Sequence, residues 1–365
     1  MFLRTSNSKF SYAAILEKNK YMPQTPDRAV MNWLFTFAFI VAFLVVFGGF
    51  VRLTRSGLSI TEWNPVSGSV PPLSQQAWEE EFSKYQQTPE FKQVNFNMTL
   101  EQYKYIFYIE WIHRFIARLA GLVYAIPVFY FLVTRKIPFR EFGVYFAMGL
   151  LFIAQAFAGW IMVASGLVDR PSVSHFNLTI HLLLALSLLG LSLWTAFGHK
   201  YGFPDKSKDV KWSLPSKLAS LSFVLLIIQI SYGGMTAGLK AGHVSDTWPL
   251  MLGRWIPPNI FSSLINIFAA PQTIVFIHRW FAFVVFIAVI ALYFAARKRS
   301  HSIGNKNGLN WLLGLVVFQI LLGILTVVLR VPIVIALAHQ AGALSLFALM
   351  IFFIQRFPAL DAQRT

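Results

Sequence analysis

Four of the eight histidines lie inside long apolar segments, namely His113, His181, His278 and His339. An imidazole inside a lipid bilayer is costly unless it has a partner, so each is a functional candidate. One such histidine alone could be a core residue or form a helix–helix hydrogen bond, but these four fall into two matching pairs. Paired imidazoles on facing helices are a ligand set for haem iron, whereas zinc takes three or four ligands around one ion. The pattern predicts two haem sites.

A carboxylate stands beside only one of these histidines. Glu110 precedes His113 by three residues, which places both side chains on one face of a helix. The matching position before His278 is Val275. A pure electron carrier needs no acid there, whereas oxidation of a methyl group benefits from a positioned proton donor or acceptor. Glu110 is therefore the candidate catalytic residue. The alternatives are that it caps a helix, pairs with Arg114 or serves as an interface charge.

Other residue types narrow the chemistry further. The chain has no cysteine, which excludes disulfides, thiolate zinc sites and iron–sulfur ligation. Four basic residues near the expected outer ends of the helices are candidates for binding haem propionates, although basic residues at such positions also simply anchor helices. These candidates are Arg52, Arg55, Lys240 and Arg254.

The elements that carry these residues form an internal repeat. Gly48-Gly49, Arg55, Gly57, Trp63 and Pro72 recur in the same order and spacing as Gly233-Gly234, Lys240, Gly242, Trp248 and Pro257. Further along, His113-Arg114 matches His278-Arg279, Gln155 and Gly159 match Gln319 and Gly323, and His181 matches His339. Each repeat contains four expected spans, so both repeats enter the membrane from the same side.

Composition identifies the elements as membrane helices. The 365 residues are 56% hydrophobic and 13% charged, against roughly 25% charged in a soluble domain. Eight segments are long enough to cross a hydrocarbon core of about 30 Å. We expect an all-α integral membrane protein with eight transmembrane helices in two tandem, pseudo-symmetric four-helix bundles. The expected spans are 31–51, 110–134, 142–168, 171–198, 218–239, 271–296, 307–329 and 331–355.

The distribution of positive charge predicts the topology. The formal net charge is +16, and Lys and Arg are about threefold denser in the segments that share a side with the N-terminus, which places both termini in the cytoplasm. The charge therefore reflects topology and not nucleic-acid binding. The predicted parts are a tail (1–30), an N-terminal bundle (31–198) with an outer loop (52–109), a linker (199–217), a C-terminal bundle (218–356) and a tail (357–365). Residues 74–92 predict one or two short helices, and Thr99 and Gln102 fit a capping box.

At this point the sequence resembles a known family. The runs Gly48-Gly-Phe-Val-Arg-Leu-Thr-Arg-Ser-Gly-Leu-Ser-Ile, Tyr108-Ile-Glu-Trp-Ile-His-Arg and Trp248-Pro-Leu-Met are similar to those of the haem A synthase family of cytochrome-oxidase assembly. The likeness covers about residues 30–356. The missing cysteine pair is typical of the mitochondrial and proteobacterial type.

The resemblance implies an activity and a division of roles. The activity is oxidation of a methyl group of haem O to the formyl group of haem A. His278 and His339 would hold a haem b cofactor, while His113 and His181 would bind the substrate haem beside the acidic Glu110. Implied partners are haem O, an unidentified electron donor, membrane lipid, and as further candidates haem O synthase and oxidase assembly factors. The short N-terminal segment favours a bacterial inner membrane over a mitochondrial one.

Two other classes of function stay open from the residues alone. The first is a bis-histidine cytochrome b that relays electrons without substrate chemistry. The second is a transporter, which parallel repeats alone would fit.

A farnesylated haem is too apolar to cross water, so a haem A synthase would admit it from the lipid side of a bundle.

Overall fold

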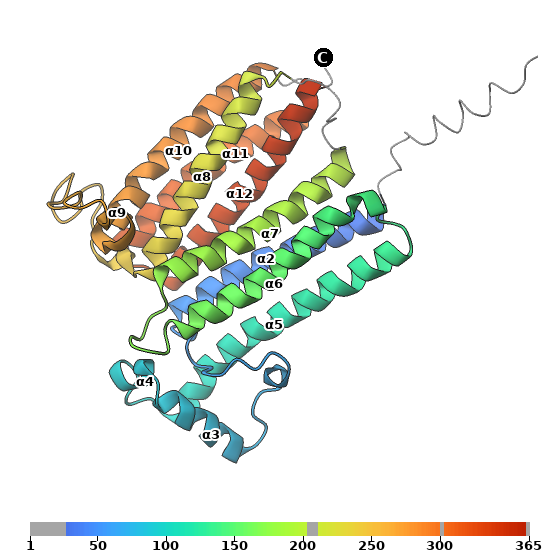
Figure 1. Cartoon of the computed structure of the whole chain (residues 1–365). Helices are drawn as coiled ribbons and strands as arrows, with labels where there is room; N and C mark the ends of the chain where they lie inside the picture. Colours follow the sequence, from blue (N-terminus) through green and yellow to red (C-terminus); the bar gives the residue numbers. More distant parts are fainter. Residues whose placement is uncertain (1–26, 203–210, 300–302, 363–365) are drawn as a thin grey trace, which may run out of the picture.

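The fold is helical throughout the residues that the structure describes. The computed structural model describes residues 27–202, 211–299 and 303–362. Eight of the helices in these ranges are long and apolar enough to cross a membrane, and these ranges contain no β-strand (Figure 1). The predicted all-α class with eight spanning helices is confirmed. They are α2 (Arg28–Leu53), α5 (Leu100–Val133), α6 (Phe142–Ala164), α7 (His175–Tyr201), α8 (Leu214–Gly238), α10 (Pro271–Arg299), α11 (Ile303–Val328) and α12 (Ile333–Ala362).

Local capping signals set several helix ends. The side chain of Asp27 accepts a hydrogen bond from the backbone N–H of Ala29 and so caps α2. Thr99 and Gln102 form the predicted capping box, and α5 therefore begins before the apolar run that starts near Glu110. Its 34 residues span about 51 Å at about 1.5 Å per residue. The outer part of α5 must therefore extend beyond the hydrocarbon core, which apolar runs alone could not predict.

The spanning helices pack as two groups of four (Figure 1). Helices α2, α5, α6 and α7 form the first group, and α8, α10, α11 and α12 form the second. The groups meet where α7 packs on α8 and α12, and where α2 packs on α12. One hydrophobic core runs through both groups and includes Phe37 of α2, Leu188 of α7, Leu292 of α10 and Phe353 of α12.

Several polar side chains cross the junction between the groups. Arg52 at the end of α2 donates a hydrogen bond to the backbone carbonyl of Ala237 in α8 at 2.8 Å. These residues occupy equivalent positions in the two repeats, so the bond crosses the pseudo-symmetry axis. Gln340 in α12 donates to the carbonyl of Val45 in α2, also at 2.8 Å. The two groups are thus joined by apolar packing and by hydrogen bonds to helix carbonyls.

The loop between α2 and α5 folds onto the outer end of α5 (Figure 1). It contains α3 (Gln75–Gln86) and α4 (Pro89–Gln93), as predicted for residues 74–92. Trp78 and Tyr85 are buried against Tyr103 and Phe107 of α5. The corresponding loop of the second repeat is less helical and holds the short α9 (Asn266–Ala269).

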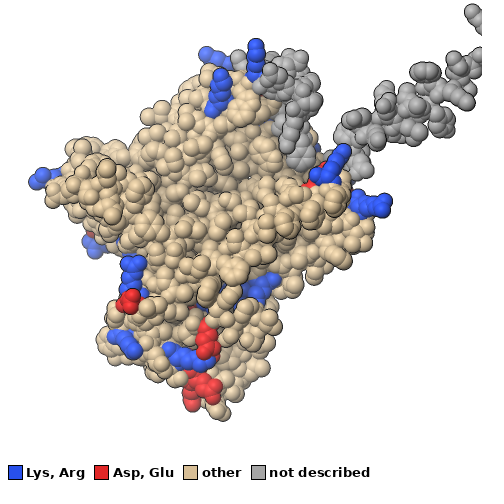
Figure 2. Space-filling model, viewed as in Figure 1, with Lys and Arg blue, Asp and Glu red and all other residues tan. Residues whose placement is uncertain are grey.

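Charged side chains gather at the ends of the helices and on the outer loop, and the helix flanks between them are largely uncharged (Figure 2). This distribution is the one that a bilayer requires. Much of the predicted N-terminal tail (residues 1–26), the centre of the predicted linker (203–210) and the end of the C-terminal tail (363–365) lie outside the described residues.

Candidate functional site

The second pair of histidines has the geometry of two ligands on one metal. The ring centroids of His278 in α10 and His339 in α12 are 6.3 Å apart, with their planes at 89°. Metal–imidazole bonds are about 2 Å long, so two imidazoles on opposite sides of one ion have ring centres roughly 6 Å apart. The spacing of the two rings therefore fits a haem iron, which both imidazoles would hold. Among the described residues no group of three or more potential ligands occurs that would instead hold a bare ion.

The surroundings of His278 leave one ring nitrogen available. Its Nδ1 lies 3.2 Å from the carbonyl oxygen of Gln229 in α8. The side-chain amide nitrogen of Gln229 lies at the same distance from Nδ1. With its proton on Nδ1 and shared with the carbonyl, His278 has the lone pair of Nε2 free for a metal, which is the usual supporting arrangement of a ligating histidine. Gln229 also donates from Nε2 to the backbone carbonyl of His278 at 2.9 Å. On the partner ligand, Gln319 of α11 donates in the same way to the carbonyl of His339 at 2.8 Å.

The first pair lies at the equivalent place in the first bundle. His113 in α5 and His181 in α7 are close enough to interact electrostatically. The ring of His113 stacks on Phe47 of α2 at a centroid distance of 6.0 Å. The structure thus brings the four predicted histidines together as two pairs, and each pair is confined to one bundle.

Every one of the four rings packs against a glycine of the preceding spanning helix. A Cβ atom added to the glycine would lie 2.8 to 3.3 Å from the ring, closer than side chains normally approach. The glycine and histidine pairs are Gly48 with His113, Gly159 with His181, Gly233 with His278, and Gly323 with His339. The sequence comparison aligned these glycines between the repeats without assigning them a role. Their role is to let the helices approach the rings.

A second residue repeats one helical turn before each glycine. Its backbone lies beside the same histidine ring, and these residues are Leu44, Gln155, Gln229 and Gln319. The carbonyl of Gln229 is within hydrogen-bonding distance of its ring, whereas Nδ1 of His181 and Nδ1 of His339 have no hydrogen-bond partner among the described residues. Three of the four are glutamines. Leu44 is the exception, and it serves His113, the histidine that has Glu110 beside it. The two bundles therefore differ at two positions around His113 and its equivalent His278. The first bundle has Glu110 where the second has Val275, and Leu44 where the second has Gln229.

The carboxylate of Glu110 is buried, with 3% of the residue exposed, and both of its oxygens have partners. Oε2 accepts hydrogen bonds from the backbone N–H and hydroxyl of Ser59, each at 2.8 Å, and from the N–H of Ile60 at 3.0 Å. Oε1 pairs with Arg114 at 2.6 Å. Of the alternatives for Glu110, the pairing with Arg114 is thus present. The carboxylate ties the start of the outer loop to α5, one helical turn from His113.

The neighbouring arginines make the same contacts in both repeats. Arg114 donates to the carbonyls of Ile60 and Glu62, and Arg279 donates to the carbonyls of Ser245 and Thr247 at the equivalent positions. Both arginines hold the loop that follows the first helix of their repeat. In the second repeat Val275, in place of Glu110, is buried with Ala241 and Met251. The acid is therefore not needed to build the frame.

The candidate propionate ligands separate into two places. Arg52, Arg55 and Lys240 lie near one another at the outer end of the junction between the bundles. Arg254 is exposed in a tight turn closed by backbone bonds with Met251, and no contact joins it to the other three within the described residues.

An acidic residue that sequence reasoning did not single out faces this basic cluster. Glu90 of α4 is buried, and its charge interacts with Arg55 and Lys240. Burial, and then the like charge of Glu110, raise the pKa of Glu90 to about 7. Burial and the nearby arginine side chains lower the pKa of Lys240.

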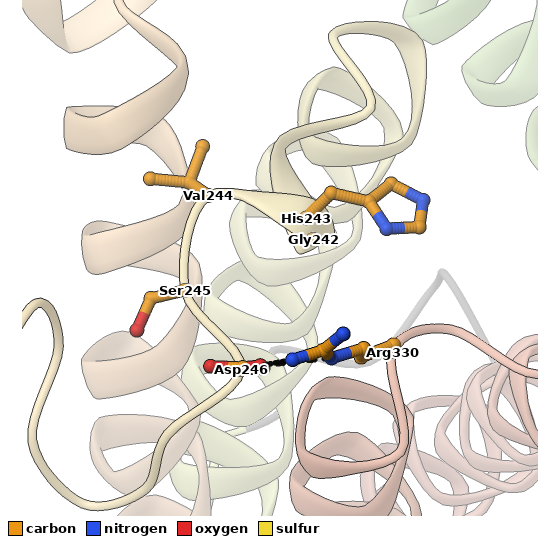
Figure 3. Close-up of a pocket in the computed structure, with 6 residues that line it drawn as sticks. All are labelled: Gly242, His243, Val244, Ser245, Asp246 and Arg330. Carbon is orange, nitrogen blue, oxygen red and sulfur yellow. Dashed lines mark hydrogen bonds and ion pairs between the residues drawn. The ribbon is translucent and has the colours of Figure 1, made fainter.

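The remaining histidines lie apart from the two pairs. His175 is buried at the start of α7, where Nε2 lies 2.9 Å from the carbonyl of Phe268. His199 lies near the end of α7, where its ring is 2.9 Å from the hydroxyl of Tyr145. A cavity of about 290 Å³ on the outer surface includes His243, beside the ion pair between Asp246 and Arg330 (Figure 3). His301 lies outside the described residues.

The glycine contacts lead to a test with a matched control on one helix. Gly323→Val places a side chain against His339, and we expect a several-fold loss of bound haem, because overpacking displaces the ligand. Gly314→Val is the control, since Gly314 is in the same helix and has open space around it. Haem content per protein after purification is the measurement. Equal haem content in the two variants would contradict the role assigned to Gly323.

Comparison with known proteins agrees with this geometry. A family model described as cytochrome oxidase assembly protein (COX15-CtaA) matches residues 31–351. The heme A synthase of Flavobacterium psychrophilum is 39% identical over 342 residues, covering 91% of this chain and 98% of that protein. Those of Wolbachia pipientis and Maricaulis maris are 41% and 42% identical, covering 90% and 91% of this chain and 92% and 96% of theirs. The chain belongs to the COX15-CtaA family of cytochrome oxidase assembly proteins, together with these heme A synthases.

Proposed function

We propose that this protein is a haem A synthase, which oxidises a methyl group of haem O to the formyl group of haem A in the membrane. The relatives named heme A synthase match almost the whole chain. The observation that carries the proposal is the unequal pair of histidine sites. Both bundles have the same histidine and glycine frame, but only the first has a buried carboxylate beside a ligand.

We further propose that the two pairs divide the work. The C-terminal bundle, residues 218–356, holds haem b on His278 and His339, and the N-terminal bundle, residues 31–198, binds haem O on His113 and His181. A bound haem supplies an iron that exchanges single electrons. The glutamines beside His278 and His339 support a permanently held cofactor, because their amides donate to the backbone carbonyls of these histidines and so brace the helices that carry them. The first histidine pair has fewer such bonds, as expected for a site that takes up a substrate haem and releases the product.

Glu110 acts in this scheme at the substrate site. Its carboxylate holds residues 59 and 60 against α5 one helical turn from His113. An ionised carboxylate at that place can accept a proton from the reacting group or from a water, or stabilise positive charge that develops there. The basic cluster of Arg52, Arg55 and Lys240 is the proposed propionate site. Arg254 is a weaker candidate because it lies in a separate turn.

The first prediction of this scheme concerns the four ligands. His278→Ala or His339→Ala should deplete the resident haem. His113→Ala or His181→Ala should leave that haem bound, with a low-spin optical spectrum, and abolish haem A formation. Haem content, spectrum and extracted pigments are measured for all four variants. Equal loss of haem from all four would contradict the division of roles.

The second prediction concerns Glu110. Glu110→Gln removes the negative charge, so haem A formed per haem b should fall by about 10²-fold or more, while haem b stays bound. Arg114→Gln is the control, because it breaks the same ion pair and loosens the same loop but keeps the carboxylate. If Glu110→Gln forms as much haem A per haem b as wild type, Glu110 takes no part in the reaction. Equal losses in the two variants would restrict Glu110 to holding the loop.

A cytochrome b that only relays electrons is the alternative function. It would contain the same histidines but would not need the asymmetry at Glu110 and Val275. Expression in a host that makes haem O, followed by extraction and chromatography of the pigments, separates the two. Haem A appears only if the protein carries out the oxidation.

The proposed location is a bacterial inner membrane with both termini in the cytoplasm and residues 57–109 outside. The electron donor, haem O synthase and oxidase assembly factors would then reach the protein in or at that membrane. After Arg364, a reporter that works only in the cytoplasm should be active and one that works only outside should be inactive, because positive charge is concentrated on the cytoplasmic side. A fusion within residues 57–109 is the control and should give the opposite result. Activity of the Arg364 fusion on the outer side would reverse the topology.

A further inference from the structure

The two bundles differ in how they close toward lipid. In the first bundle, α2 packs closely on α7, and this side faces the second bundle. The opposite side lies between α5 and α6, which touch more sparsely than their counterparts α10 and α11. Over the described residues, the ring contacts and hydrogen bonds between α5 and α6 all involve Tyr124. Tyr124 lies about 16 Å inward of His113 along the helix.

At the level of the histidines a different residue joins these helices. Trp63 comes from the outer loop and stacks on Trp160 of α6, with ring centroids 5.3 Å apart and planes at 23°. It also contacts Phe157, at a centroid distance of 6.0 Å. Trp160 directly follows Gly159, the glycine against which His181 packs. The three aromatic residues Trp63, Phe157 and Trp160, here called the aromatic bridge, therefore lie beside the first histidine pair.

The backbone on both sides of Trp63 is held by α5. Arg114 donates to the carbonyl of Glu62, and Arg118 donates to the carbonyls of Asn64 and Pro65. The loop is thus attached to one helix while the indole ring reaches the other. Trp63 and Trp160 are each 43% exposed. The bridge consequently presents an aromatic surface toward lipid.

The second bundle lacks this arrangement although it has the matching tryptophan. Trp248 is the equivalent of Trp63, but it packs on Trp280 and Phe283, both in α10, the helix to which its own loop is attached. The positions equivalent to Phe157 and Trp160 in the repeat are Leu321 and Ile324. The bundle proposed to hold a permanent cofactor is closed by direct helix contact. Within the described residues, only the other bundle has a loop tryptophan that stacks on its third helix.

We propose that the aromatic bridge binds the isoprenoid tail of the substrate haem where the tail leaves the bundle between α5 and α6. This inference rests on the proposed function and deepens it. A farnesyl tail is apolar and flexible, so it lies at the lipid-facing side and packs on flat aromatic surfaces there. Trp63 is then a specificity-determining residue, which favours a prenylated haem over the same macrocycle without the tail.

The test compares the affinity for haem O with that for haem B, which lacks the farnesyl tail. Purified protein containing its resident haem is titrated with each compound, and binding at the first pair is followed by difference spectra. We expect wild type to bind haem O more tightly than haem B. In Trp63→Ala the ratio of the two affinities should fall about tenfold, because only the binding of haem O becomes weaker. Trp63→Phe should restore most of the lost preference. Trp248→Ala is the matched control and should keep the wild-type preference.

Other outcomes overturn the inference. If Trp63→Ala weakens both haems equally, the residue only holds the loop, and if it weakens neither, the tail does not contact it. Trp160→Leu removes the α6 half of the bridge without touching the loop, so it tests the same preference if Trp63→Ala fails to fold, which the resident haem content reports. Failure of the proposed function is distinguishable, because wild type would then form no haem A from haem O. A wild type that forms haem A while both variants keep full preference refutes the bridge alone.

Discussion

The structure depends on one constraint, which is that an imidazole ring in the hydrocarbon layer must be surrounded by helices yet keep one nitrogen available. Each ring meets this constraint by packing on a glycine and on the backbone one helical turn before it. The glycine removes the side chain that would hold the helices apart, and at His278 the carbonyl of Gln229 lies within hydrogen-bonding distance of one ring nitrogen. Helix spacing, ring orientation and the pairing of helices within each bundle all follow from these contacts.

Duplication of this frame allowed the two halves to diverge in chemistry without a change in fold. Arg114 and Arg279 make the same loop contacts in both halves, so the loop anchor is common to both. The additions are local: Glu110 in place of Val275, Leu44 in place of Gln229, and an aromatic contact from Trp63 to α6. Each change lies beside the first histidine pair or over the lipid-facing side next to it. Under the proposed function, such local changes are enough to turn a frame that holds a haem permanently into one that binds a haem which reacts and leaves.

The sequence was sufficient for the features that follow from periodicity and composition. Apolar length identified the eight spans. The repeat showed that His113 is equivalent to His278 and that His181 is equivalent to His339. The partners of long polar side chains could not be predicted, because Arg52 reaches a backbone carbonyl in the other bundle and a carbonyl leaves no signal in the sequence. For Glu110 the pairing with Arg114 was among the alternatives drawn from the sequence, whereas its hydrogen bonds from the backbone N–H groups of Ser59 and Ile60 were not. Trp63 and Trp248 occupy matching positions but contact different helices, which no alignment of the two repeats could reveal.

The unequal closing of the two bundles connects the fold to the proposed chemistry. A cofactor that stays bound gains from ligands fixed by amide hydrogen bonds and from helices in direct contact on every side. A substrate that enters from lipid and returns to it needs a side that can yield, and helix contacts are too extensive to break in each turnover. In the first bundle, the link from the loop on α5 to α6 at the level of the histidines is one side chain, the indole ring of Trp63. The loop itself stays in place because its backbone is bonded to α5 by Arg114 and Arg118, so movement at Trp63 need not disturb Glu110 or the histidines.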